Sequence, residues 1–527
     1  MRIQEIHTMK QLLTGLGSLL MICLLQMNDA YCAGPYWQGL PVSQPTWQKW
    51  SPALPIPVVA PTASPESLML ALSEATSSAP AYLYSLHKTK PSSIAAIYER
   101  DLLLQKRDWK SGNLVPAFGT VGTLSDVNSW HNHDPKALVI GGDGYLYILF
   151  YDHHDITYRI QKRDPITGTL EPSFGSSGTL NVGNINYQKL LALPGSDGLL
   201  IITGGLDGLY SAYFAKYYSY TSGAVSGSYT VTVDKQWLTT TTFGDATLYN
   251  GSLYTAVNIK SLTDQKYRIT RTDVVSGAKQ WEQTYANPLF QKEKATAMAV
   301  DGSGVYLAGA NTQDFLVYNV SENFVRKYDS TTGNLITGWG QGGGTVKIPF
   351  LSMFFQSVEN LTLRVSENTL YLLNNGTSSS SFFIFPLSSS SSATLSRINK
   401  STGVPDSSFA DNGLAKVAKG KFPYVILDKW GSVGIIGSDG SFTGDYIAKL
   451  ALTPISYGPL VDSGIRYKTA TGTVSIAAEP VGLSSSPLRI RKNGTTYSLP
   501  LVEPDDPASA NILIQSPLGT KSLTKFP

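Results

Sequence analysis

The stretch that decides the fold is "QKRDPITGTLEPSFGSSGTL", residues 161–180. It contains a compact polar turn, Asp164-Pro-Ile-Thr-Gly168, and Phe174 and Gly178 follow the turn. The pattern recurs along the chain. Aligned on the glycine of the turn, the copies are "KRDWKSG" (106–112), "KRDPITG" (162–168), "YYSYTSG" (217–223), "RTDVVSG" (271–277), "KYDSTTG" (327–333) and "RINKSTG" (397–403). Successive glycines lie 56, 55, 54, 56 and 70 residues apart, and periods of this length predict a repeat architecture.

The copies keep the same residue types at the same distances from the glycine. Ser or Thr precedes the glycine in all six, and a short polar residue stands four positions before it. An aromatic stands six positions after it in five copies: Phe118, Phe174, Tyr229, Trp339 and Phe409. A short polar side chain accepts hydrogen bonds from backbone N–H groups just ahead of it, and glycine adopts the left-handed conformation that lets the chain return. The recurring residues therefore build a turn between neighbouring strands.

A second turn lies upstream of each copy, as in "VIGGDGYLYIL" (139–149) and "VDGSGVYLAG" (300–309), and β-rich segments flank both turns. Each copy therefore predicts four antiparallel strands. Such units repeated around an axis form a β-propeller, an all-β fold. Seven blades are predicted, with six as the alternative. The segment 445–452 lacks a following strand and the segment 81–86 a preceding one, so we expect strands from both ends to close the ring. The sequence does not show which strand completes which blade.

The turn with its downstream aromatic resembles the repeat of quinoprotein-type propellers. The longer form "TGTLEPSFGSSGTL" (167–180) resembles the bacterial delta-sixty repeat of the same broad group. The resemblance covers roughly residues 81–453 and implies the propeller fold. It implies little about activity, because the matching residues build turns.

The N-terminus predicts an export signal over residues 1–33. An apolar stretch runs from Leu12 to Met27, and the small residue Ala33 provides a cleavage point. No other segment approaches the length and hydropathy of a membrane span. Both cysteines, Cys23 and Cys32, lie in this segment, so cleavage after Ala33 leaves a mature chain without disulfides. We expect a secreted or cell-surface protein.

Two further regions flank the predicted propeller at 81–453. Residues 34–80 are rich in proline, and within them "SPESLMLALSEA" (64–75) predicts a short helix. Residues 454–527 predict a small C-terminal β-domain of three hairpins, the second with the tight-turn pair Asn493-Gly494.

Charge argues against one class of partner. The net charge is +3 over 527 residues, and charged residues make up only 15% of the chain. A nucleic-acid partner therefore has no electrostatic support.

Two loops predict a metal site. In a propeller the loops that precede the first strand and follow the second strand of a blade open on the same face. "WHNHDP" (130–135) and "YDHHDIT" (151–157) occupy these places in one blade. Imidazole and carboxylate groups are ligands for zinc, manganese or iron, although adjacent side chains on an extended segment point to opposite sides. The alternative is a set of solvated loop histidines. The candidate ligands of a divalent metal ion are His131, His133, Asp134, Asp152, His153 and His154.

A second loop pair predicts an apolar patch. "IPFLSMFF" (348–355) precedes a first strand, and "SSSSFFIFPLSSSSS" (378–392) is expected to fill the loop after the second strand of that blade. The apolar side chains either pack back on the blade or form a surface for a partner. The candidate partner-binding residues are Phe350, Phe354, Phe355, Phe382, Phe383 and Phe385.

The leading hypothesis is a binding or cell-surface scaffold that holds a protein or carbohydrate ligand on its face loops. The alternative is an enzyme, either a metal-assisted hydrolase or lyase that uses the loops at 131–155, or a quinone-dependent dehydrogenase. The family resemblance implies the dehydrogenase, but such enzymes often carry a disulfide of adjacent cysteines against the cofactor, which this mature chain cannot form. No motif identifies catalytic residues.

Overall fold

In the computed structural model, the described residues are 47–48, 69–73 and 81–88, most of 102–450, and separate strands between 461 and 523. The segments between these ranges, and residues 1–46, lie outside the described part. The chain divides into two compact units, one that holds the strands up to β28 and one that holds those from β29 on. No helix occurs among the described residues, and none there is long and apolar enough to cross a membrane.

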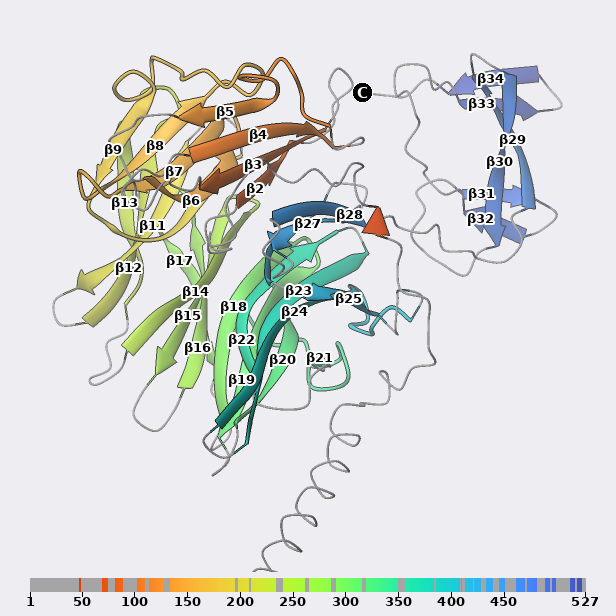
Figure 1. Ribbon diagram of the computed structural model, residues 1–527. Coiled ribbons are helices and arrows are strands. Elements are labelled where there is room, and N and C mark those ends of the chain that lie inside the picture. Colours follow the sequence, from red (N-terminus) through yellow and green to blue (C-terminus); the bar gives the residue numbers. More distant parts are fainter. Residues whose placement is uncertain are drawn as a thin grey trace, which may run out of the picture. The chain divides into compact units, whose positions relative to one another are not determined.

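The first unit is built from antiparallel meanders, each of which follows the chain order of its strands (Figure 1). The first three are β2 (Met69–Leu72), β3 (Tyr82–Lys88), β4 (Leu102–Asp108) and β5 (Thr123–Asp126); β6 (His133–Ile140), β7 (Leu146–Asp152), β8 (Thr157–Arg163) and β9 (Thr179–Gly183); and β10 (Asn186–Ala192), β11 (Leu199–Asp207), β12 (Tyr210–Tyr218) and β13 (Val225–Val233).

The next three meanders are β14 (Thr240–Tyr249), β15 (Ser252–Lys260), β16 (Gln265–Asp273) and β17 (Lys279–Tyr285); β18 (Gln291–Asp301), β19 (Gly304–Asp314), β20 (Asn319–Tyr328) and β21 (Thr345–Ile348); and β22 (Gln356–Val365), β23 (Thr369–Phe382), β24 (Phe385–Asn399) and β25 (Leu414–Lys419). One parallel pair, Gln265↔Lys292, joins the β14–β17 and β18–β21 meanders into an eight-stranded sheet.

Strands from both ends of the chain close the ring, as expected, although two of them lie within residues 34–80, which were predicted to lie outside the propeller. The last meander consists of β26 (Lys421–Leu427), β27 (Val433–Ser438) and β28 (Asp445–Leu450), and its fourth strand is the short β1 (Trp47–Gln48). In Figure 1 the red β1 lies beside the blue β28. The first strands of successive meanders contact one another in order, and β26 contacts β2. This closed circle confirms the predicted β-propeller, with seven meanders that form six hydrogen-bonded sheets among the described residues.

The predicted helix at 64–75 is wrong. Met69–Leu72 is strand β2, paired with β3 from Met69↔Leu86 to Leu72↔Leu83. Burial along β2 alternates with a period of two residues, Met69 and Ala71 being buried. The local preference of Met, Leu and Ala for helix gives way to the hydrogen bonds that β3 offers and to contacts with β6 and β26.

The predicted loop at 378–392 is also wrong over most of its length. The backbone continues as a paired hairpin, in which Ser378 pairs with Ser390, Ser380 with Ser388, and Phe382 with Phe385. Pairing satisfies the backbone groups that the two serine runs turn toward each other, which a loop would leave to water. Of the candidate partner-binding residues, Phe350, Phe354, Phe355 and Phe383 lie outside the described residues, and only the backbone of Phe382 and Phe385 is described.

The recurring turn has the predicted geometry. In the copy that opens the sequence, the backbone N–H groups of Ile166 and Thr167 donate to Asp164 Oδ1 at 2.8 and 2.7 Å. Gly168 has a φ of +81° and donates its N–H to the Asp164 carbonyl at 2.9 Å. Burial alone would raise the pKa of Asp164, but the hydrogen bonds from Thr167 and Ile166 outweigh it and lower that pKa.

Each turn from Gly168 on also packs closely against an aromatic of the preceding copy, which the sequence did not predict. A Cβ on Gly168 would lie 3.0 Å from the Phe118 ring, and one on Gly403 would lie 2.8 Å from the Trp339 ring. The glycines are therefore required for close approach as well as for φ. The same contact joins Phe174 to Gly223, Tyr229 to Gly277 and Trp281 to Gly333.

A basic residue stands six positions before the turn glycine in five of the six copies, the exception being Tyr217. In the first two copies it reinforces this contact between neighbouring turns. Lys106 Nζ donates to the Pro165 carbonyl in the following turn at 2.8 Å, and Lys162 Nζ donates to the Tyr220 carbonyl at 2.8 Å. Burial lowers the pKa of Lys106, while the charge of Asp164 opposes that effect. Residues that look like independent parts of one turn therefore join neighbouring meanders.

The second unit contains β29 (Val461–Thr469), β30 (Gly472–Pro480), β31 (Arg489–Lys492), β32 (Thr495–Ser498), β33 (Ile512–Ser516) and β34 (Gly519–Leu523). They form a six-stranded sheet in the order β31-β32-β30-β29-β33-β34. The three predicted hairpins are present, and Lys492 pairs with Thr495 across the predicted Asn493-Gly494 turn.

Candidate functional site

Two of the six candidate metal ligands meet in the β6–β9 meander. His133 begins β6, Asp152 ends β7, and the two are direct partners in the ladder. Both are buried, with exposures of 6% and 0%. His133 Nε2 lies 3.7 Å from Asp152 Oδ2, and Arg159 Nε of β8 lies 3.4 Å from the same oxygen. The loop topology inferred from sequence thus brings these two residues together.

The other described candidates have partners of their own. Asp134 pairs with Lys136 at 2.7 Å, the His153 ring lies edge-on to Tyr151 with centroids 4.7 Å apart, and His154 Nδ1 lies 2.9 Å from Asp155 Oδ1. His131 lies outside the described residues.

Asp152 also has a local structural role. Its Oδ1 accepts the backbone N–H of His154 at 3.0 Å, which stabilises the turn after β7. Within the described ranges, no group of three His, Cys, Asp or Glu side chains could hold a metal ion. The metal site stays a prediction, and it needs a further ligand beside His133 and Asp152.

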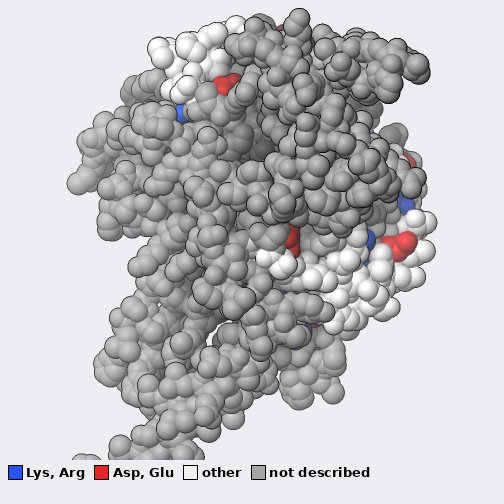
Figure 2. Space-filling model, turned by 90° about the vertical axis from the view of Figure 1, so that its right-hand side faces the viewer, with Lys and Arg blue, Asp and Glu red and all other residues white. Residues whose placement is uncertain are grey.

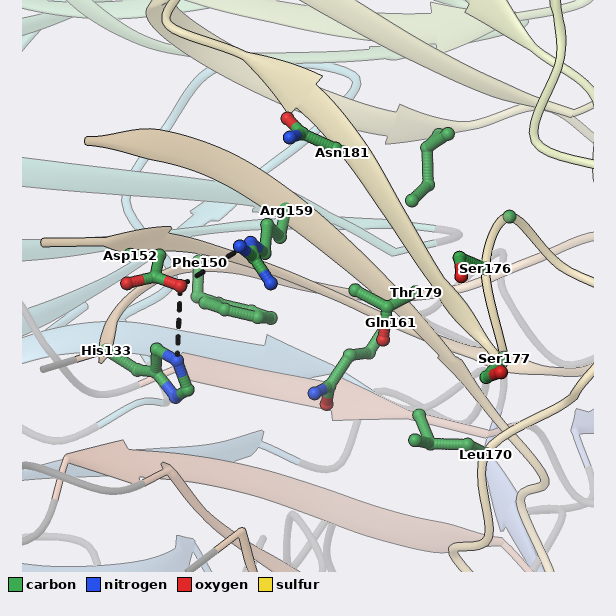
Figure 3. A pocket seen from close by; sticks show the side chains of 12 residues that line it. His133, Phe150, Asp152, Arg159, Gln161, Leu170, Ser176, Ser177, Thr179 and Asn181 are labelled. Carbon is green, nitrogen blue, oxygen red and sulfur yellow. Dashed lines mark ion pairs between the residues drawn. The ribbon is translucent and has the colours of Figure 1, made fainter. Parts of the chain in front are cut away.

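His133, Asp152 and Arg159 instead line one side of an open pocket of about 640 Å³ (Figure 3). The rest of the lining comes from Phe150, Gln161, Leu170, Gly175, Ser176, Ser177, Thr179, Leu180 and Asn181. All of these residues belong to the β6–β9 meander or to the connection between β8 and β9. This volume lies within the range of about 300–1,000 Å³ typical of ligand pockets.

The pocket has a charged, largely buried floor, formed by His133, Asp152, Arg159 and Gln161. It has an exposed, uncharged rim, formed by Ser176, Ser177 and Asn181. His133, Asp152 and Gln161 are buried, and the His133 ring packs against Phe150 with centroids 4.6 Å apart. Ladder pairing places Thr179 opposite Gln161 and Asn181 opposite Arg159, so these four share one face of the sheet.

The rim presents exposed hydrogen-bonding side chains. Ser176, Ser177 and Asn181 are exposed, and in Figure 3 the two serines stand on the loop across from Arg159 and Asp152. Asn181 Oδ1 accepts hydrogen bonds from Thr157 Oγ1 at 2.7 Å and from the Gly183 N–H at 2.8 Å. The amide group is thereby oriented with its Nδ2 donor end available to a ligand.

Sequence reasoning missed the rim because its residues lie in the recurring element. The segment Gly175-Ser-Ser-Gly178 corresponds to Gly119-Thr-Val-Gly122 of the preceding copy, and its third residue is left-handed in both, with φ of +53° at Ser177 and +52° at Val121. The replacement of Val by Ser at this place was the signal that could have identified the rim.

Figure 2 shows one face of the molecule, on which the described acidic and basic side chains are few and lie among uncharged residues. The pocket floor holds the Asp152 carboxylate between the His133 imidazole and the Arg159 guanidinium.

No protein-family model and no curated protein matches the sequence. Solved structures with a similar arrangement include the polysaccharide lyase Uly1, at 10% identity and a TM-score of 0.42 over 78% of this chain and 98% of that one. The Nup133 β-propeller domain of Vanderwaltozyma polyspora is 9% identical, with a TM-score of 0.33 over 73% of this chain and 100% of that one. A GH43 β-1,3-galactosidase is 9% identical, with a TM-score of 0.28 over 62% and 80%. Likenesses this weak say nothing about activity.

Proposed function

We propose that the protein is a binding propeller whose β6–β9 pocket takes a neutral, polyhydroxylated ligand such as a unit of a carbohydrate. The observation that carries the proposal is the combination of a charged buried floor with a rim of hydroxyl and amide groups in one pocket.

Each hydroxyl of a sugar both donates and accepts a hydrogen bond. The rim serines can also do both, the Asn181 amide donates, the Arg159 guanidinium donates and the Asp152 carboxylate accepts. Because Arg159 and His133 flank Asp152, the floor does not present a lone negative charge that would select a cation. The set favours a neutral ligand with many hydroxyls over an ion.

The test is calorimetric titration of the purified mature chain with a panel of neutral and acidic oligosaccharides. Asn181→Asp keeps the oxygen that Thr157 and Gly183 use but removes the amide donor. Ser177→Val introduces the residue of the preceding copy. Each change should weaken binding by about 5- to 10-fold, as expected from one hydrogen bond worth about 1 kcal/mol.

The matched control is Val121→Ser, which makes the reverse exchange outside the pocket and should leave affinity unchanged. Absence of binding to the whole panel, or binding that both pocket variants leave intact, would contradict the proposal.

We also propose that the protein acts outside the cell. The support is the export-signal pattern of residues 1–33 and the lack of cysteine after position 32. N-terminal sequencing of protein recovered from the culture medium should begin near residue 34, and retention of the full N-terminus inside the cell would contradict export.

A further inference from the structure

Four buried polar side chains gather where the β18–β21 meander meets the β22–β25 meander. Asn323 of β20 and Asn374 of β23 have exposures of 0%, as does Ser396 of β24, and Thr394 has 1%. In the described part of the chain, neither amide atom of either asparagine has a hydrogen-bond partner, and the same holds for both hydroxyl oxygens. Buried amides and hydroxyls are normally paired with protein or with ordered water.

The ladder registers place these groups in one interface. One apolar cluster spans both meanders and contains Val325 of β20 and Leu372 of β23. Side chains two residues apart on a strand share a face, so Asn323 lies on the Val325 side and Asn374 on the Leu372 side. Thr394 is the ladder partner of Asn374, and Ser396 is that of Leu372. All four side chains therefore face the seam between the meanders.

The copies differ in side-chain size at one position of this seam. The position six residues before the opening residue of the turn is occupied by Tyr158, Tyr213 and Tyr267 in three consecutive meanders and by Asn323 in the next. Tyr213 and Tyr267 are buried and fill their seams with a phenol ring. The carboxamide of Asn323 is much shorter than a phenol ring, so we expect room for a small molecule beside these polar atoms.

A neighbouring seam shows how a buried amide is otherwise satisfied. Asn258 of β15 is 1% exposed, yet its Nδ2 donates to the Ala295 carbonyl at 2.9 Å and its Oδ1 accepts the Ala295 N–H at 2.7 Å. The protein itself provides both partners there. At Asn323 and Asn374 it provides neither.

We propose that the seam between the β18–β21 and β22–β25 meanders is a binding site for ordered water, held by Asn323, Asn374, Thr394 and Ser396. A buried water needs a polar cavity with two to four hydrogen-bonding groups. The two amides supply donors and acceptors, and the two hydroxyls supply both. The apolar side chains around the seam enclose the water, which makes its exchange with bulk solvent slow.

The test is magnetic relaxation dispersion of water, which detects long-lived internal water in the whole folded chain. Asn374→Val introduces the residue that β15 carries at the corresponding place, Val257, and Asn323→Tyr restores the ring of the earlier copies. Both variants should reduce the dispersion amplitude. The control Val257→Ile alters a different seam and leaves the four polar side chains of this one in place, so it should leave the amplitude unchanged.

A folded Asn374→Val variant with undiminished amplitude would overturn the proposal. If either variant fails to fold, a high-resolution crystal structure of the unaltered protein decides the question. Solvent density within hydrogen-bonding distance of the Asn323 and Asn374 amides supports the site, and an empty seam refutes it.

Discussion

Replacement of Gly403 by alanine tests the lock between neighbouring meanders. Gly403 has a φ of +75°, and a Cβ there would lie 2.6 Å from both the Cα and the N of Gly340 and 2.8 Å from the Trp339 ring. The Gly340 N–H donates to the Thr402 carbonyl at 2.9 Å, and Trp339 Nε1 donates to the Lys400 carbonyl at 2.9 Å. The methyl group cannot be accommodated unless these paired backbone segments separate.

The magnitude has two parts. The left-handed conformation alone costs an alanine about 1–2 kcal/mol. Displacement of a packed backbone adds overpacking strain of about 1–3 kcal/mol, so Gly403→Ala should lose about 2–5 kcal/mol of the free energy of unfolding. Gly144→Ala is the matched control, because Gly144 has a φ of +84° and nothing within 4 Å of its Cβ position. It should lose only the conformational part.

Urea unfolding followed by circular dichroism measures both variants against the unaltered chain. The quantity of interest is the difference between them, because it removes the cost of the φ angle. Equal losses for Gly403→Ala and Gly144→Ala, with equal m values, would refute the lock between the copies and leave the glycine as a turn residue only.

Three further outcomes are expected. Glu293 is 2% exposed, and Arg326 donates to it at 2.6 and 2.7 Å. Glu293→Gln should lower the free energy of unfolding in urea by about 3–5 kcal/mol, because the partly buried guanidinium of Arg326 loses its counter-charge. Hydrogen bonds from Thr332 lower the pKa of Asp329, and slight burial opposes them only in part. The contribution of Asp329 to the free energy of unfolding is therefore present above about pH 4 and is lost as the pH falls through the pKa of the folded state. Asp329→Asn should make the free energy of unfolding depend less on pH in that acid range. Burial raises the pKa of Tyr267 to about 12, so the contribution of its neutral phenol to the free energy of unfolding is lost only as the pH rises from about 10 through that value. The tyrosinate absorbance of the Tyr267→Phe variant should equal that of the unaltered protein near pH 10 and fall below it near pH 12.

The local chemistry of the turn was readable from sequence because it depends on residues close together in the chain. Asp164 accepts the N–H groups two and three positions ahead, and Gly168 adopts the left-handed conformation that only glycine takes without strain. The register of these residues predicted the repeat, the four-stranded unit and the propeller.

The candidate site was predicted only in part. Loop topology brought His133 and Asp152 together, since both lie at the same end of paired strands. It could not show that Asp134 would pair with Lys136, because the face of the sheet that each β6 residue takes depends on the register of β6 with β7. Ser176 and Ser177 of the rim were not predicted, because they lie in the recurring element, whose residues predict a turn and no binding role.

The amino-acid sequence by itself determined the turn, the strand count and the circular repeat, because short-range hydrogen bonds and glycine conformation depend on neighbouring residues. Tertiary structure alone decided that Trp47–Gln48 completes the last meander and that Met69–Leu72 is a strand. Those short segments gain their hydrogen bonds from partners far along the chain. Which segment pairs with the free strand edge of the last meander depends on the geometry of the ring, and no local sequence pattern predicts it.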